Sequence, residues 1–230
     1  MSNSSFVAYT NFSPNNYGQR TQPITRITPH CTVGQIGIES LGVMFANPAQ
    51  EAASNYGIGY DGRVGMYVPE NKAAWCSSNY DNDSRAVTIE CASDSYEPYS
   101  MSNNVWLSLI ALCVDICQRN NKSHLLWITD KDKALAYQCA PNEMLLTIHR
   151  WFAATACPGD WLYDRLSELA GIVTERLQSV SASAEESSDL YRVQVGAFRI
   201  RENAESYRDE LVAKGYPDAF IVTIKDYFKE

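Results

Sequence analysis

Histidine and positive charge are both scarce in this chain. Only three of its 230 residues are histidine, and 19 lysines and arginines stand against 27 aspartates and glutamates. The formal net charge at neutral pH is therefore −8. Because binding to nucleic acid phosphates requires a concentrated positive surface, this balance argues against a nucleic acid partner.

Long apolar runs are also absent. No run approaches the roughly 18 residues that a membrane-spanning helix needs, so we expect no membrane partner. The first residues, MSNSSFVAYTNF, have neither the basic start nor the apolar stretch of a secretory signal. We therefore expect the chain to remain in the cytoplasm of the cell that makes it. A target outside that compartment would have to be reached with the help of another protein.

The cysteines do not form an obvious disulfide framework. Their number is odd, and several lie inside apolar, periodic segments, which is typical of reduced and buried thiols. The seven are Cys31, Cys76, Cys91, Cys113, Cys117, Cys139 and Cys157.

Composition divides the chain into two parts. Apolar residues make up 45% of the whole, which is enough for the larger part to bury a core. The small, polar and acidic stretch at 179–189 is typical of a linker. We therefore predict a main domain at 1–178, a linker at 179–189 and a small unit at 190–230.

The hydrophobic pattern of the main domain alternates between strands and helices. Strand patterns and one hairpin, with its turn at Asp61-Gly62, occur at 23–33, 54–68, 85–92, 124–129 and 144–151. Helical spacing occurs at 103–120 and 159–177. This mixture predicts an α/β fold with a central mixed β-sheet flanked by helices.

Two of the histidines stand where a site could form. His30 and His149 each lie at or near the end of a predicted strand, whereas His124 follows a polar stretch and is expected in a loop. Cys157 comes eight residues after His149, just before Pro158, which we expect to open the last helix. A helix N-terminus stabilises a thiolate, which is the form that binds metal.

These residue types leave three interpretations open. Two imidazoles and one thiolate are sound zinc ligands, and three protein ligands leave the fourth position free, as in catalytic zinc sites. Alternatively, His149 and Cys157 form the dyad of a thiol enzyme, which gives His30 no role. The third interpretation is ordinary core packing. Cys31 follows His30 on the same strand and should face the opposite side, so we expect a buried role for it.

Four separated motifs carry a family resemblance. They are ITPHCTVG, ASNYGIGYDGRVGMYV, NDSRAVTIECA and LTIHRWFAATACPGDWLYDRL, and they occur in this order. Together they resemble the type-2 N-acetylmuramoyl-L-alanine amidases, which include phage endolysins of Gram-positive hosts and are related to the peptidoglycan recognition proteins. The resemblance covers nearly all of 1–178. It implies that His30, His149 and Cys157 bind Zn²⁺.

The resemblance also implies catalytic helpers. Glu90 would act as the general base and acid, and Tyr56 and Thr155 would donate hydrogen bonds to the oxyanion. Some members have lysine where this chain has Thr155, so a positive charge is missing there. From the residues alone, Glu90 could be an exposed or ion-paired side chain, Tyr56 could belong to hairpin packing, and Thr155 could cap a helix.

The C-terminal part has a second resemblance. Its pattern predicts a small strand–helix–strand (βαβ) unit. The pieces YRVQVGAF, ENAES and KGYPDAFIV resemble the SPOR domain, a peptidoglycan-binding module with two such halves. Only one half is present, and about 40 residues make too small a core to stand alone. We expect the unit either to pair with a second copy, giving a homodimer, or to dock on the main domain.

The implied activity is zinc-dependent hydrolysis of the amide bond between N-acetylmuramic acid and L-alanine in peptidoglycan, which lyses the cell wall. A phage endolysin, held in the cytoplasm of the bacterial host before lysis and acting on the wall afterwards, is the leading expectation. A bacterial autolysin with the same chemistry and a non-catalytic protein that binds muropeptides are the alternatives. Binding-only relatives often lack the cysteine ligand, which this chain has.

Overall fold

The computed structural model describes residues 3–184, 195–216 and 219–221. It divides into two compact units, residues 1–185 and 186–230, and each is described by itself. The first unit holds all the strands assigned in the described residues, and the second holds one helix.

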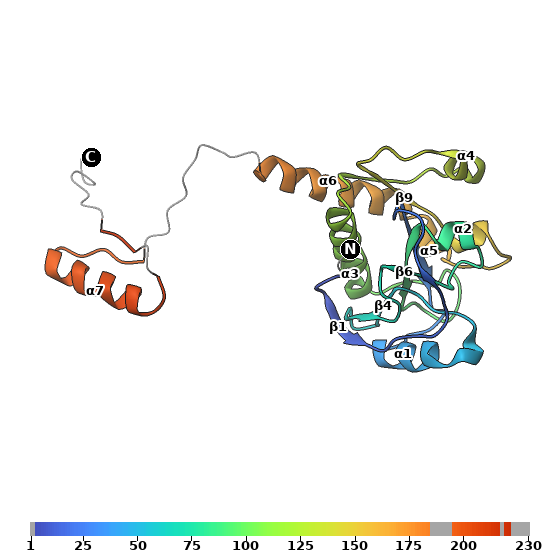
Figure 1. Ribbon diagram of the computed structural model, residues 1–230, viewed down its shortest axis with the longest axis horizontal. Helices are drawn as coiled ribbons and strands as arrows, with labels where there is room; N and C mark the ends of the chain where they lie inside the picture. The colour runs from blue at the N-terminus through green and yellow to red at the C-terminus, as the bar shows by residue number, and fades with distance from the viewer. Residues whose placement is uncertain (1–2, 185–194, 217–218, 222–230) are drawn as a thin grey trace. The chain divides into compact units, whose positions relative to one another are not determined.

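A seven-stranded mixed sheet forms the centre of the first unit (Figure 1). Only the β4–β5 pair is antiparallel within it; the other neighbouring strands run parallel. The predicted α/β fold with a central mixed sheet is therefore confirmed. In spatial order the strands are β1 (Val7–Thr10), β5 (Val64–Met66), β4 (Tyr56–Ile58), β7 (Ala86–Cys91), β3 (Arg26–Cys31), β9 (Glu143–Leu146) and β8 (His124–Leu126).

One face of this sheet is apolar and packs against two long helices. They are α3 (Asn103–Arg119) and α6 (Leu166–Ala184). The hydroxyl of Ser102 caps α3 by accepting a hydrogen bond from the amide of Val105. The helical spacing of α3 places its apolar side chains on one face of the helix. They pack against alternate residues of β3 and β7, and these side chains form much of the main core.

The opposite face is polar at its centre. β3 and β7 pair in parallel with His30 beside Glu90 and Thr28 beside Thr88, and these side chains point away from α3. Helix α1 (Ile38–Ala46) covers one end of this face, where Leu41 packs close to Gly57. The polar centre is thus left for the site.

Shorter elements complete the first unit. A second, two-stranded sheet pairs β2 with β6 in antiparallel fashion. The remaining elements are β2 (Asn16–Gln19), η1 (Pro48–Gln50), β6 (Lys72–Ala74), α2 (Tyr80–Asp83), α4 (Lys131–Ala136), η2 (His149–Trp151) and α5 (Asp160–Tyr163).

The expected hairpin is present, and Gly62 takes the left-handed φ of +86° that its turn requires. Two other expectations need correction. The single helix predicted at 159–177 is two helices, α5 and α6, and α6 continues to Ala184, inside the predicted linker. His124 is the first residue of β8, as the strand pattern at 124–129 predicts, and not the loop residue expected from the polar stretch before it.

The second unit contains helix α7 (Arg201–Ala213), as the pattern of the tail predicts. The first strand expected beside it falls mainly on 191–194, outside the described residues, and half of the second, expected at 219–224, falls on 222–224, which is outside them too. The βαβ arrangement therefore stays a prediction. Among the described helices, none is both long and apolar enough to cross a membrane.

Candidate metal centre

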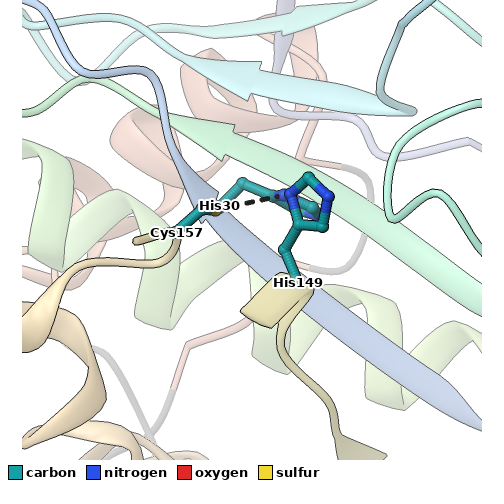
Figure 2. Close-up of side chains that lie close together, drawn as sticks. All are labelled: His30, His149 and Cys157. Carbon is teal, nitrogen blue, oxygen red and sulfur yellow. Dashed lines mark hydrogen bonds between the residues drawn. The ribbon is translucent and has the colours of Figure 1, made fainter. Parts of the chain in front are cut away.

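Three segments that are remote in sequence bring His30, His149 and Cys157 together (Figure 2). His30 lies near the end of β3 on the polar face of the sheet, and its side chain is buried. His149 opens η2, three residues after β9, and Cys157 follows on the loop before α5. The structure thus places the three predicted ligands in one cluster.

The spacing of their atoms suits one metal ion. The Cys157 Sγ lies 3.3 Å from the His30 Nδ1, and the two imidazole centroids are 5.0 Å apart. One potential ligand atom from each of the three residues lies within 4.8 Å of the others. With zinc–nitrogen and zinc–sulfur bonds of about 2.0 and 2.3 Å, two ligands of a tetrahedral zinc are separated by roughly 3.6 Å.

The protonation of the imidazoles also suits a metal. Burial holds the pKa of His30 well below its usual value, and the neighbouring His149 lowers it further. Burial likewise lowers the pKa of His149. Both rings are therefore neutral near pH 7, as ligands must be. The buried Nε2 of His149 has no hydrogen-bond partner, and a metal ion would satisfy it.

The loop that carries Cys157 is fixed by its own hydrogen bonds. The Thr155 hydroxyl accepts from the Cys157 amide at 3.2 Å, and the Arg150 guanidinium donates to the Ala156 carbonyl at 2.6 Å. The helix expected to start at Pro158 begins only at Asp160 and is a single turn. The proposed stabilisation of the thiolate by a helix N-terminus was therefore wrong, because no long helix begins at Cys157.

Cys31 contacts the predicted ligand. Its thiol is buried, as expected, and shares a hydrogen bond with the Cys157 thiol. This bond, followed by burial, raises the pKa of Cys157, and the same bond lowers the pKa of Cys31. The protonation of each of these two thiols therefore depends on the other.

Glu90, the predicted general base, lies beside the predicted ligands. Its Oε1 is 3.9 Å from the His30 Nδ1, and its buried Oε2 has no hydrogen-bond partner. Burial, with a contribution from Cys31, raises the pKa of Glu90 to about 8. The structure thus brings Glu90 to the predicted ligands as a partly buried side chain, and its role as a base stays a prediction.

Tyr56 does not reach this site, which corrects the expectation drawn from the resemblance. It pairs in register with Ile89, so its side chain lies on the α3 face, opposite to Glu90. Its hydroxyl donates to the Glu70 carboxylate at 2.6 Å and accepts from the Ser4 amide at 2.9 Å. Arg119 holds the same carboxylate.

Replacing Tyr56 with phenylalanine should therefore affect stability rather than chemistry. The change removes two hydrogen bonds, one to the buried Glu70 carboxylate and one from the Ser4 amide, so we expect the free energy of unfolding to fall by about 1 to 3 kcal/mol. The rate of the folded enzyme should change by less than about twofold, because no contact to the reacting atoms is lost. Chemical denaturation and a rate assay at the same temperature check both. A large rate loss in fully folded Tyr56→Phe protein would contradict this conclusion and support a catalytic role for Tyr56.

Thr155 lies two residues before Cys157, and its hydroxyl contacts the backbone of that residue. The hydroxyl oxygen accepts from the Cys157 amide, and the hydroxyl proton is then available to another acceptor. Donation to an oxyanion stays a prediction.

One cluster member was missed by sequence reasoning. The Cys76 Sγ lies 3.3 Å from the His30 Nε2 and 4.0 Å from the Glu90 Oε1. Asp83 anchors its loop by accepting from the amides of Cys76 and Ser77. Cys76 stands two residues after β6 and has no metal-ligand spacing to any histidine, so no sequence signal pointed to it. With Nδ1 binding a metal, the sulfur would accept from the Nε2 proton and fix the tautomer of His30.

A cleft of about 240 Å³ adjoins the cluster at His149. Trp75 packs edge-on against Tyr17 at 5.8 Å between ring centroids. Trp151, by contrast, stacks on Trp127 and is mostly buried in the core. The cleft is lined by Tyr17, Glu51, Ala52, Trp75, Cys76, Ser78 and His149.

Comparison with known proteins agrees with this geometry. Residues 20–160 match the N-acetylmuramoyl-L-alanine amidase family, and residues 161–228 match the SPOR domain. The SPOR match is longer than the segment that carried the resemblance, and it includes most of α5 and all of α6, both of which belong to the first unit. No curated protein matches the sequence.

Solved structures share the fold. The hydrolase AmiA of Staphylococcus aureus is similar with a TM-score of 0.53 and 14% identity, covering 79% of this chain and 87% of its own. A selenomethionine derivative of AmpD has a TM-score of 0.50 and 18% identity, covering 74% of this chain and 99% of its own. The amidase match spans more than half of the sequence, and it includes His30, Glu90, His149 and Cys157. This chain therefore belongs to the N-acetylmuramoyl-L-alanine amidase family and carries a SPOR domain.

Proposed function

We propose that the protein is a zinc-dependent amidase that cleaves the bond between the lactyl group of N-acetylmuramic acid and the L-alanine of the stem peptide. The observation that carries this proposal is the convergence of His30, His149 and Cys157 within one cluster beside Glu90. Family membership supports the amidase class, and the donor set supports the choice of zinc. When bound, zinc supplies Lewis acidity that activates water and polarises a carbonyl group.

Glu90 takes the proton of the attacking water in this proposal and passes it to the leaving amine. Burial raises the pKa of this carboxyl toward neutral pH, and a raised pKa favours a group that both takes up and gives back a proton. Its only neighbours within salt-bridge or sulfur hydrogen-bond distance among the described residues are His30 and Cys76. The carboxylate is therefore not held by a structural cation that would remove its basicity.

The cleft beside His149 is the proposed place of the substrate. Trp75 and Tyr17 offer aromatic surface to the sugar or to the methyl groups of the peptide. Thr155 is the remaining candidate for an oxyanion donor, since Tyr56 faces the other side of the sheet.

A wall-hydrolysis assay tests this function. We expect Gram-positive cell walls to lose turbidity and to release new amino termini of L-alanine, a chelator to stop both, and zinc to restore both. Binding to walls without new amino termini would favour the non-catalytic alternative. Lysis without L-alanine termini would assign the cut to another bond.

We further propose an endolysin role, in which the protein is stored in the host bacterial cytoplasm and reaches the wall at lysis. A bacterial autolysin with the same chemistry is the alternative. Expression of the protein in phage-infected cells, compared with its expression in uninfected cells, separates the two roles. The endolysin proposal requires that only the infected cells produce the protein.

The C-terminal unit is proposed to pair with a second copy. The described part of the unit exposes apolar side chains, among them Val195, Phe198, Ile200 and Val212. A unit of about 45 residues has too little interior to bury them alone. We expect the full chain to scatter light as a dimer and residues 1–185 to scatter as a monomer. If both are monomers, the pairing is wrong and docking on the first unit becomes the better account.

A further inference from the structure

The imidazole of His30 has a thiol at each of its two nitrogens. Cys157 lies 3.3 Å from Nδ1, and Cys76 lies 3.3 Å from Nε2. The two nitrogens of an imidazole point away from each other, so one ion cannot bind both sulfurs through this ring. The thiol of Cys76 therefore marks a second position that the predicted catalytic centre does not use.

Glu90 completes a second set of donors around that position. Its Oε1 lies 4.0 Å from the Cys76 Sγ and 3.9 Å from the His30 Nδ1, and one ligand atom from each of His30, Cys76 and Glu90 lies within 4.8 Å of the other two. The other carboxylate oxygen, Oε2, is buried without a partner. Thiolate, imidazole and carboxylate together form a ligand set that zinc and softer divalent ions accept.

We propose that His30, Cys76 and Glu90 form a second, competing site for a thiophilic divalent cation, such as zinc in excess or cadmium. The charges favour such an ion, since a thiolate and a carboxylate neutralise a divalent cation completely. The set of His30, His149 and Cys157 leaves one positive charge uncompensated. In a buried place, neutralising a charge removes much of the penalty of taking it out of water.

The position is open to an ion from solvent. Cys76 is only partly buried and lines the same cleft as His149. An ion entering the cleft therefore meets Cys76 without any rearrangement of the core.

The two positions compete for His30. A neutral imidazole has one lone pair available to a metal, so an ion on Nε2 takes the ring away from an ion on Nδ1. The second ion also occupies Glu90, which the proposed function needs as a base. Excess thiophilic metal should thus inhibit the enzyme through Cys76.

Cadmium titration tests the site without reference to activity. The charge-transfer band of a cadmium–thiolate bond reports whether a cysteine binds. In Cys157→Ser, which lacks the thiolate of the first centre, we expect cadmium to bind with this band through Cys76. In Cys157→Ser/Cys76→Ser the band should be lost, which also controls for the other five cysteines. No band in folded Cys157→Ser, or an equal band in the double variant, would overturn the proposal.

Circular dichroism checks that each variant folds. If Cys157→Ser does not fold, Cys157→Ala and Cys157→Ala/Cys76→Ser give the same comparison. The band of the single variant should again be lost in the double variant, because neither thiol beside His30 remains. An unchanged band would contradict the site.

Inhibition by excess zinc gives a functional arm, which rests on the proposed amidase activity. We expect Cys76→Ser to need at least about tenfold more zinc for half-inhibition than wild type, equal to about 1.4 kcal/mol of lost binding. Cys139→Ser, at a partly buried thiol outside the cluster, should behave as wild type. Equal inhibition of all three proteins would contradict the competing site, whereas a lack of activity in every protein would count against the proposed function instead.

Discussion

Replacing His149 with alanine should remove both the metal and the activity. The two remaining residues of the cluster, His30 and Cys157, cannot complete the three-ligand set that catalytic zinc sites use. We expect zinc content, measured after unbound and excess metal are removed, to fall from one ion per chain to a small fraction, because the second set of His30, Cys76 and Glu90 fills only with excess zinc. Hydrolysis should fall by at least about a thousandfold, equal to about 4 kcal/mol of lost transition-state stabilisation.

His124→Ala is the matched control for this experiment. His124 is the third histidine and lies on β8, where Ser123 and Gln178 hold its two ring nitrogens. Zinc content and rate should remain at the wild-type level in this variant. If His149→Ala keeps a full equivalent of zinc and its rate, the assignment of His149 as a ligand is wrong.

Replacing Glu90 with glutamine should separate metal binding from catalysis. Glutamine keeps the size of the side chain but cannot take a proton from water, so we expect the rate to fall by about 100- to 10,000-fold. Zinc should stay bound, because His30, His149 and Cys157 are unchanged. The measurement is the rate of release of L-alanine amino termini, made on protein whose zinc content has been determined.

Glu143→Gln controls for the loss of a carboxylate elsewhere on the sheet. Glu143 lies on β9, where its carboxylate accepts from Tyr137 and from the amide of Ala140. Its replacement should leave the rate within about twofold of wild type. A Glu90→Gln enzyme that retains zinc and more than a third of the rate would exclude Glu90 as the base.

Much of the fold followed from local patterns. The alternation at 85–92 correctly predicted β7, the Asp61-Gly62 turn correctly predicted the hairpin of β4 and β5, and the helical spacing at 103–120 correctly predicted α3. Each of these signals lies within one short segment of the sequence, so it can be interpreted without knowing which other segments pack against it. The break between α5 and α6 carried no glycine or proline to mark it, and it was missed.

The site was harder to predict because it depends on how strands pair. Alternation shows which residues of β4 share a face, but only the register with β7 shows that Tyr56 lies beside Ile89 and away from Glu90. His30, His149 and Cys157 lie together in the structure, and it was the family resemblance, not any local pattern, that linked the three in the sequence. Cys76 belongs to a loop without periodicity, so only the folded chain could place its sulfur beside His30.

The most direct test of the account is zinc-edge X-ray absorption of the protein loaded with one equivalent of zinc. We expect the spectrum to show two imidazole nitrogens, one sulfur and one oxygen around the zinc, contributed by His30, His149, Cys157 and a water molecule. A shell with one imidazole, one sulfur and two oxygens would place the ion at Cys76 and Glu90 instead. A shell without sulfur would contradict the central claim that Cys157 holds the catalytic metal.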